Sequence, residues 1–137
     1  MTSQLKAIVP AGMEGAGPAY GFAPGRVAGG FLFVAGQIGM DRNGNLGQTV
    51  QEQASMALNN LELVLKEAGC TLADVVVLNT FHVGDCTTVN EWFLPLKKDI
   101  FPAPYPAWTS MGITSLAIPG VLIEISAIAE MPNMRAG

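Results

Sequence analysis

The stretch TVQEQASMALNNLELVLKEAG, residues 49–69, decides the fold class more than any other part of this sequence. Its apolar residues recur at spacings of three and four, which predicts an amphipathic helix over about residues 50–68. Thr49 and Glu52 have the spacing of a capping box, and Gly69 stands where a helix commonly ends. One face of this helix must therefore pack against another element.

The segments around this helix are rich in β-branched and aromatic residues, which is typical of strands. We predict strands at residues 5–9, 31–38, 74–83, 107–116 and 121–129, the first of them at a sheet edge. A loop rich in glycine and proline is expected between the first two strands. Asn43-Gly44 predicts a tight turn after the second strand, because both residues tolerate positive φ.

A second, shorter helix is predicted before the last two strands. Thr88 and Glu91 again have capping-box spacing. The face that follows carries large apolar residues, namely Trp92, Phe93, Leu96 and Ile100. Pro95 lies inside this segment, so we expect the helix to kink or to end early there. The order of elements predicts an α+β domain, a mixed sheet with two helices on one face.

Length and composition restrict the architecture. The chain, residues 1–137, is expected to form one domain, because domains usually hold about 100–200 residues. Hydrophobic residues make up 50% and charged residues only 13%, which excludes intrinsic disorder. So few charges on a small domain indicate that part of its surface is buried between subunits. We expect the uncovered face of the sheet to make that contact.

The charges and cysteines indicate which classes of partner the protein binds and in which cell compartment it acts. The net charge is −4 and the basic residues are scattered, so we expect no nucleic acid to bind. No apolar stretch approaches the roughly 18 residues of a membrane span, and no secretory signal is evident. We therefore expect no membrane contact. Cys70 and Cys86 are the only cysteines and lack CxxC spacing, which suits the reducing cytoplasm.

Glu124 is the sharpest candidate for chemistry. It lies in VLIEISAIA, residues 121–129, where strand alternation places it on the same face as Ser126 and Ile128. A carboxyl group shielded from water has a raised pKa and can hold a proton or orient a water molecule near neutral pH. The alternative is a glutamate that is simply solvated on a half-wet outer face of the sheet.

The other reactive residue types are interpreted as structural. His82 lies in the middle of a predicted strand and is interpreted as packed or interfacial, although its ordinary pKa would suit a base. Cys70 and Cys86 have no activating neighbour in the sequence and are expected to be inert. With one histidine and two distant cysteines, no metal site is expected. The sequence contains no GxSxG, GxGxxG or GxxxxGK motif.

Several motifs together resemble the reactive intermediate deaminase family, also called Rid, YjgF or endoribonuclease L-PSP. They are Phe33-Val-Ala-Gly-Gln-Ile-Gly39, the helix pattern from Gln53 to Gly69, Asp74-Val-Val, Val89-Asn-Glu91, Pro106-Ala107 and Leu122-Ile-Glu-Ile. The resemblance covers about residues 20–130. It implies a chorismate-mutase-like fold and a homotrimer whose sheets close a central β-barrel. Small-molecule sites would then lie in the clefts between subunits.

The resemblance also implies an activity that needs no cofactor, the hydrolysis of enamines and imines to carbonyl compounds and ammonia. By the same resemblance, Glu124 positions the attacking water and Gly36 contacts the ligand through its backbone N–H. Asn90 is implied to lie near the ligand. Tyr20 matches a family tyrosine, though at a different spacing, and Ala35 replaces the usual serine.

One departure from the family pattern changes the expected substrate. Family members have Pro-Ala-Arg where this chain has Pro106-Ala107-Trp108, and that arginine clamps the carboxylate of a 2-imino acid. Tryptophan offers an apolar face and one N–H donor instead. We therefore expect a substrate other than 2-aminoacrylate, stacked on Trp108, such as a ring-cleavage product resembling 2-aminomuconate. Arg26, or a basic residue of the neighbouring subunit, would supply the cation.

The sequence leaves a second interpretation of the function open. A trimer of this fold without the arginine could have lost deamination and bind a small metabolite or a protein partner. Stabilisation by a ligand without any ammonia release would identify such a protein.

Overall fold

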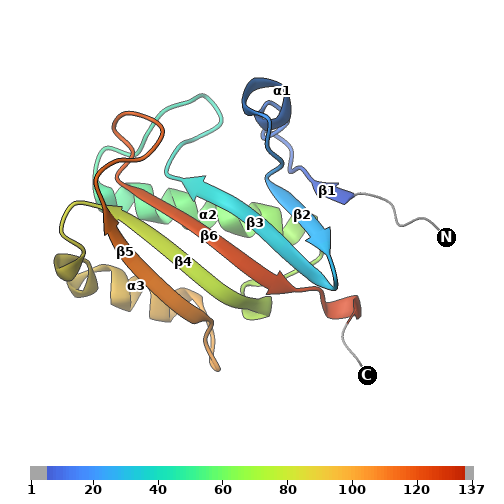
Figure 1. The fold of residues 1–137 in the computed structure, drawn as a ribbon. Coiled ribbons are helices and arrows are strands. Elements are labelled where there is room, and N and C mark those ends of the chain that lie inside the picture. The colour runs from blue at the N-terminus through green and yellow to red at the C-terminus, as the bar shows by residue number, and fades with distance from the viewer. Residues whose placement is uncertain (1–5, 135–137) are drawn as a thin grey trace.

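One sheet of six strands forms the frame of the molecule. The computed structural model describes residues 6–134, and of Met134 only the backbone. The strands are β1 (Lys6–Ile8), β2 (Gly25–Ala28), β3 (Phe31–Ile38), β4 (Val75–Val83), β5 (Ala107–Ile113) and β6 (Ile123–Glu130). They lie in the order β1-β2-β3-β6-β4-β5 (Figure 1). Since β4 and β5 pair in parallel and the other neighbours are antiparallel, the predicted mixed sheet is confirmed. The last two strands are separated by a longer loop than predicted.

Two helices cover one face of this sheet, as predicted (Figure 1). α2 (Val50–Glu67) matches its predicted bounds to within one residue, and α3 spans Phe93–Ile100. The Thr49 hydroxyl caps α2 by accepting from the Glu52 N–H at 3.1 Å. The Glu52 carboxylate accepts from the Gln48 N–H and not from that of Thr49. None of the helices in residues 6–134 is long and apolar enough to cross a membrane.

The start of α3 differs from the prediction. A 3-10 turn, η2 (Cys86–Glu91), precedes it, and the Asp85 carboxylate caps this turn by accepting a backbone N–H at 2.9 Å. The predicted cap at Thr88 is therefore wrong, and its hydroxyl donates to the Asp85 carbonyl instead. The expected kink or early end at Pro95 is wrong too. Because α3 begins at Phe93, Pro95 falls in the first turn, where a proline removes no helical hydrogen bond.

The segment rich in glycine near the N-terminus holds structure that the sequence did not predict. The edge strand β1 is confirmed at Lys6–Ile8, while residue 5 of the predicted range lies outside the described residues. A short helix α1 (Ala16–Tyr20) and strand β2 follow, where only a loop was expected. Gly25, at the start of β2, has a low strand propensity, so the sequence does not predict a strand there. Packing against α2 nevertheless requires a glycine at this position. A Cβ added to Gly25 would lie 2.9 Å from Cγ1 of Val64 in α2.

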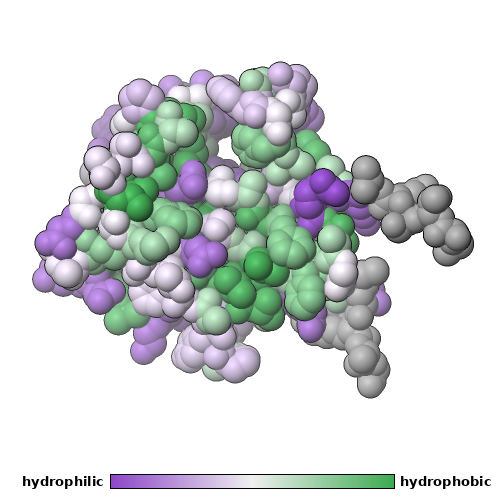
Figure 2. Space-filling view, viewed as in Figure 1, coloured by the Kyte–Doolittle hydropathy of each residue, from purple (hydrophilic) through white to green (hydrophobic). Residues whose placement is uncertain are grey.

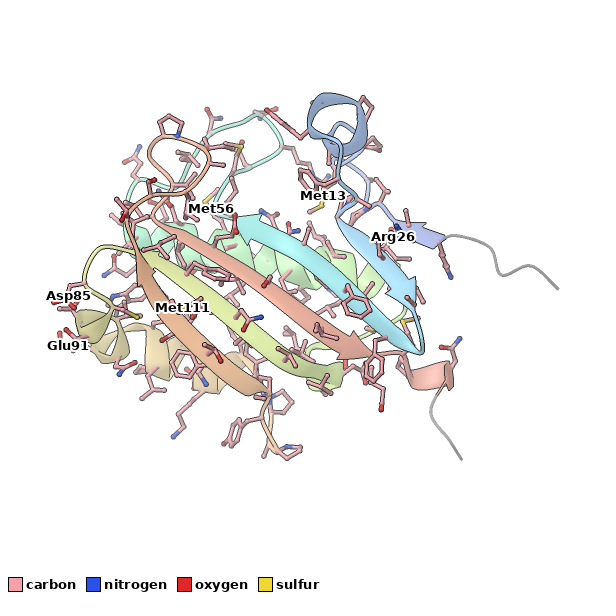
Figure 3. The ribbon with its side chains drawn as sticks, in the orientation of Figure 1. Met13, Arg26, Met56, Asp85, Glu91 and Met111 are labelled. Atoms are coloured by element: carbon pink, nitrogen blue, oxygen red, sulfur yellow. The ribbon has the colours of Figure 1, made fainter. Side chains whose placement is uncertain are left out.

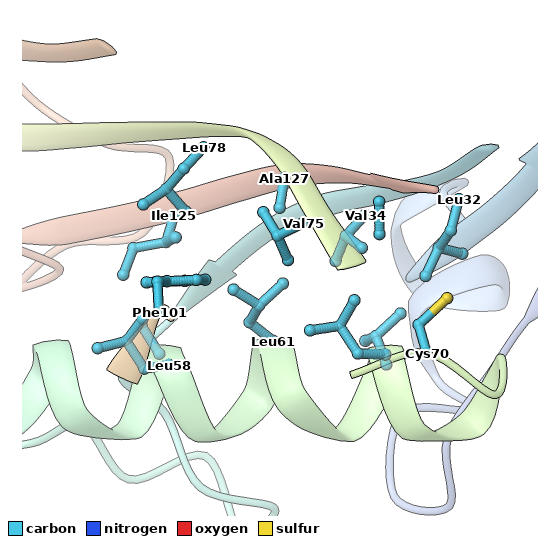
Figure 4. Close-up of a cluster of buried hydrophobic side chains, with 14 of the residues drawn as sticks. Leu32, Val34, Leu58, Leu61, Cys70, Val75, Leu78, Phe101, Ile125 and Ala127 are labelled. Carbon is cyan, nitrogen blue, oxygen red and sulfur yellow. The ribbon is translucent and has the colours of Figure 1, made fainter. Parts of the chain in front are cut away.

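The hydrophobic core lies between α2 and the sheet (Figure 4). Leu58, Leu61 and Leu65 of α2 are buried against the helix-covered face. That face contributes Leu32, Val34, Leu78, Ile125 and Ala127 from three central strands. Each fully buried leucine or isoleucine stabilises the fold by about 1.5–3 kcal/mol relative to exposure. Two further 3-10 turns, η1 (Leu72–Asp74) and η3 (Pro132–Met134), lie at the ends of β4 and β6.

The other face of the sheet is turned toward the viewer in Figure 1, and no helix of the described residues lies over it. Its strands present the large apolar side chains Phe31, Phe33, Val77, Phe81, Met111 and Ile128. Figure 2 shows this open face as green areas interrupted by a few polar groups. Phe33 is 44% and Met111 is 47% exposed. A contiguous apolar surface is typical of an interaction site, so contact with another subunit stays a prediction for this face.

Candidate functional site

A cavity of about 630 Å³ lies at one end of the sheet. It is enclosed by the segment around α1, the loop after β3 and the loop before β6, and Figure 2 shows an opening between these parts. Its walls are mainly apolar and include Met13, Tyr20, Phe22, Ile38, Met40 and Ile118. Small-molecule sites are commonly about 300–1,000 Å³ and mostly apolar, with a few polar groups that orient the ligand. This cavity has both properties.

Glu124 and Gly36 form part of the cavity floor. Glu124 projects from β6 toward the open face, and its backbone pairs with that of Ile38 at the end of β3. The register of β3 shifts between Val34 and Gln37, so that the strand bulges at Gly36. A Cβ added to Gly36 would lie 2.5 Å from both Cδ and Oε2 of Glu124. The carboxyl group therefore lies directly against the Gly36 backbone and depends on the missing side chain.

The environment of Glu124 changes its acidity. Burial raises the pKa of its carboxyl above the ordinary value of 4.5, because the charged form loses solvation. No donor among residues 6–134 forms a hydrogen bond with the carboxyl oxygens. The half-buried group thus lies in a sheltered cavity and not on a fully solvated face. It is available to hold a water molecule or a ligand.

Two amide side chains of α2, the buried Gln53 and the half-buried Asn60, hold the cavity walls in place. The Gln53 amide donates to the carbonyls of Gly47 and Gly120, at 3.1 and 3.0 Å, and its oxygen accepts from the Leu122 N–H at 2.8 Å. The Asn60 amide donates to the carbonyls of Ile38 and Met40. Helix α2 therefore fixes both the loop after β3 and the loop before β6.

Arg42 is a cation of this cavity that the sequence did not reveal. It lies in the loop after β3 and lines the cavity together with Glu124. Its side chain crosses Gly12, where an added Cβ would come within 2.6 Å of Nε. The neighbouring Asp41 shapes the turn, since its Oδ1 accepts the N–H groups of Asn43 and Asn45. A turn motif at residues 41–45 is visible in the sequence, but no pattern shows that its arginine lines the same cavity as Glu124.

Of the six residues predicted for the site, the cavity of one chain brings together three, Tyr20, Gly36 and Glu124. Asn90 is exposed in η2, beside α3, and does not line the cavity. Arg26 lies on β2 (Figure 3), in the register row of Phe33 and Ile128 on the open face. Ile128 and Glu124 are four residues apart on β6, which is about 13 Å at the usual strand rise. Arg26 does not line the cavity, so within one chain it does not supply the cation.

Trp108 lies on the helix-covered face, opposite to Glu124. It is paired in register with the buried Leu78, and its Nε1–H donates to the Thr80 hydroxyl at 3.0 Å. The Lys97 ammonium nitrogen lies 4.3 Å from the centroid of the indole ring. A cation at this distance from an aromatic ring is attracted to its face. Stacking of Trp108 on a substrate stays a prediction, and it requires the cleft of a neighbouring subunit.

The remaining reactive residues are packed, as the sequence indicated. His82 is only 2% exposed, lies edge-on against Phe93, and its Nε2 is 2.8 Å from the Thr80 hydroxyl oxygen. Burial lowers the pKa of the imidazole below 6.5, and Nδ1 has no partner within the described residues. Cys70 is buried beneath the sheet, and the Cys86 sulfur lies 3.5 Å from the Ser110 hydroxyl oxygen. Residues 6–134 contain no cluster of His, Cys, Asp or Glu that could hold a metal.

Comparison with known proteins places this geometry in a family. Residues 15–131 match the family model described as Endoribonuclease L-PSP. The chain belongs to this family, also named Rid or YjgF. The RutC family protein YjgH of Escherichia coli K12 is 36% identical over 128 residues, which cover 93% of this chain and 95% of that protein. The human 2-iminobutanoate/2-iminopropanoate deaminase is 34% identical over 102 residues, covering 72% of this chain and 71% of that protein.

Solved structures of Rid-family proteins have the same fold. The structure of YjgH matches with a TM-score of 0.83 at 34% identity and covers 95% of this chain and 98% of its own. A Mycobacterium tuberculosis member of the YjgF/YER057c/UK114 family matches with a TM-score of 0.74 at 28% identity. That match covers 90% of this chain and 98% of the other. The predicted α+β fold of the YjgF type is thereby confirmed.

Proposed function

We propose that this Rid-family protein is a cofactor-independent deaminase that hydrolyses imines and enamines to carbonyl compounds and ammonia. The observation that carries the proposal is the carboxyl of Glu124, which lies against Gly36 at the floor of an apolar cavity. Burial raises its pKa toward the range in which a carboxyl both takes up and returns protons. Relatives named 2-iminobutanoate/2-iminopropanoate deaminase support this reaction class.

The proposed reaction consumes one water molecule and returns Glu124 unchanged. The carboxylate accepts a proton from water as the water oxygen bonds to the carbon of the C=N group. The π electron pair moves to nitrogen, which takes the proton from Glu124 and leaves a carbinolamine. Glu124 then accepts the hydroxyl proton and passes a proton to the nitrogen, the C–N bond breaks, and the carbonyl product and ammonia leave. An enamine enters the same sequence after a proton moves from its nitrogen to carbon.

The proposed substrate is larger than 2-aminoacrylate. The cavity is roomy for a three-carbon acid, and its walls are mainly apolar. Trp108 stands where the family pattern has the arginine that clamps a 2-imino acid, so that clamp is missing. A conjugated imine or enamine from ring cleavage, resembling 2-aminomuconate, suits these features. The net charge of −4 and the scattered basic residues do not favour a ribonuclease, which must bind the phosphates of RNA.

We also propose a homotrimer, acting in the cytoplasm, in which the open faces of the sheets close a central β-barrel. The apolar side chains of this face support the proposal, since they have no cover within the described chain. In such a trimer, the exposed Asn90 of one subunit would complete the cavity of the next. Trp108 would join it there by turning its indole out of the contact with Thr80 and Lys97. The site would then use all the residues predicted for it except Arg26.

Glu124→Gln tests the proposed mechanism. The amide keeps the size of the side chain but does not accept and return a proton, so ammonia release should fall by about 100-fold or more. The assay uses a panel of imines generated in place, from 2-iminopropanoate to longer apolar imines. Glu67→Gln, on the exposed side of α2, is the matched control and should keep full activity.

Two outcomes would count against the mechanism. Full ammonia release by Glu124→Gln would show that the reaction does not depend on the Glu124 carboxyl. Stabilisation of the native protein by panel members without any turnover would indicate the second candidate, a trimer that binds a metabolite without converting it.

A further inference from the structure

The loop after β3 places a positive charge in the cavity that holds the proposed reaction centre. Arg42 is exposed at the rim of the cavity, whereas Glu124 is half-buried at the floor. Their backbones are linked through Ile38, which pairs with Glu124, and Arg42 follows four residues later. At the usual rise of an extended chain, four residues span at most about 13 Å. One molecule of several carbons can therefore contact both side chains.

Two acidic groups near Arg42 accept backbone donors: Asp41 is its neighbour in the sequence, and Glu14 is bonded to Gly12. Asp41 accepts the N–H groups of Asn43 and Asn45, and backbone hydrogen bonds lower its pKa. Glu14 accepts the N–H of Gly12, the residue that the Arg42 side chain crosses, at 2.7 Å. No acidic side chain in residues 6–134 forms an ion pair with Arg42. Its guanidinium donors are thus available to a ligand in the cavity.

We propose that Arg42 is a specificity-determining residue that binds an anionic group of the substrate, distant from the C=N carbon. The inference rests on the proposed deaminase function and narrows its substrate class. The substrate is an imine or enamine with an apolar body and a carboxylate several bonds from the reacting carbon. The apolar walls, including Met13 beneath α1 (Figure 3) and Met40, hold the body between Arg42 and Glu124. A guanidinium suits this role because it binds a carboxylate through two parallel hydrogen bonds.

Binding of a matched pair of probes tests this inference without turnover. The probes are 5-oxohexanoate, the carbonyl product of such an imine, and its uncharged methyl ester. Titration calorimetry on the full chain should show that the acid binds more tightly than the ester. Arg42→Gln keeps much of the side chain over Gly12 and should weaken binding of the acid by about 10- to 100-fold, leaving the ester unchanged. Arg42→Lys should restore part of the loss, because it keeps the charge without the planar fork.

Lys66→Gln is the matched control, since Lys66 is exposed on α2, outside the cavity and away from the open face, and should leave both affinities unchanged. Equal binding of acid and ester by the native protein would overturn the inference. An unchanged acid affinity in Arg42→Gln would overturn it as well, as would an equal loss in Lys66→Gln.

Glu124→Gln separates this inference from the proposed function. Its preference for acid over ester should persist, because the variant leaves Arg42 untouched. If the native protein releases no ammonia but still prefers the acid over the ester, the deaminase function is contradicted and the anion site stands. If instead the protein releases ammonia and Arg42→Gln does not change that activity, the proposed anion site is contradicted and the deaminase function stands.

Discussion

Glu124 and Gly36 act as a pair at the floor of the cavity. The carboxyl occupies the space that a side chain on Gly36 would fill, and the bulge of β3 brings the two strands to this separation. The carboxyl is therefore held at the sheet surface while water reaches only part of it. Desolvation then raises the pKa of the carboxyl.

Gly36→Ala should lower activity while sparing stability. The backbone of Gly36 is not in the left-handed region, and the atoms that a Cβ would meet are at the end of the flexible Glu124 side chain. That side chain can swing away, so we expect ammonia release to fall at least about tenfold and the melting temperature to change little. Paired activity and thermal-unfolding measurements check this. Gly17→Ala, where a Cβ meets only Phe22 O at 3.9 Å, is the control and should retain activity.

The sequence predicts the residues at the floor of the cavity better than the residues that form its walls. Strand alternation marked Glu124, and a family resemblance marked Gly36 and Tyr20, which line the same cavity. Arg42 was missed because its position depends on contact between two loops about 30 residues apart, at Gly12 and Arg42. Arg26 was expected to supply the cation, but the pairing of β2 with β3 places it on the open face outside the cavity.

At the scale of elements, the two capping boxes had different outcomes. Thr49 caps α2 as its spacing predicts, whereas Thr88 was displaced by Asp85, which starts the η2 turn three residues earlier. The two sequence patterns are the same. The difference arises because a long amphipathic stretch follows Thr49 and extends the helix, while the short segment after Thr88 forms a 3-10 turn before α3.

Thr49→Ala should lower the free energy of unfolding by about 1 kcal/mol, because it leaves the Glu52 N–H without its cap. Thr88→Ala should cost only a few tenths of a kcal/mol, since the Thr88 hydroxyl caps no helix. Urea unfolding of the two variants beside the native protein measures both effects. Equal losses would contradict the assignment of the two caps.

Elements with a strong periodic signal were predicted, and elements formed by packing were not. α2, β3 and β4 have enough apolar residues at one period to specify their own structure. β2 forms because β3 offers it a hydrogen-bonding edge, and α1 has only five residues. Such short elements obtain their stability from neighbours that are distant in sequence.

At the scale of the whole molecule, two buried groups oppose each other in the pH dependence of stability. Burial lowers the pKa of His82 below 6.5, so its contribution is complete above pH 6.5 and is lost as the pH falls. Burial raises the pKa of Glu124 above 4.5, so the folded state is penalised as the pH rises through that raised pKa. Asp41 and Asp85, whose pKa values are lowered from 3.8 by hydrogen bonds, affect stability only at more acidic pH.

Two variants should therefore change the slope of stability against pH in opposite directions. Between pH 7.5 and 5, Glu124→Gln should make the loss of stability on acidification steeper, and His82→Gln should make it shallower. The slope from one titrating group does not exceed about 1.4 kcal/mol per pH unit. Denaturant titrations at several pH values measure these slopes. The same slope in all three proteins would contradict the pKa directions.

The open face should determine the assembly state. Phe33→Lys places a charge in the centre of this apolar surface, and a buried unpaired charge opposes association. We expect the native protein to sediment as a trimer and the variant to shift toward the monomer. Leu94→Lys, on the exposed side of α3, is a matched control that should leave the mass unchanged. A native protein that sediments as a monomer would contradict the proposed trimer.

Gln53 has a consequence for how this scaffold can diversify. One amide fastens the ends of both cavity loops to α2, at Gly47 and at Gly120. Residues within these two loops, such as Met40 and Ile118, are then exchangeable without loosening the sheet. Selection, or a protein engineer, can thus change which ligands the cavity binds while α2 and the sheet beneath it stay the same.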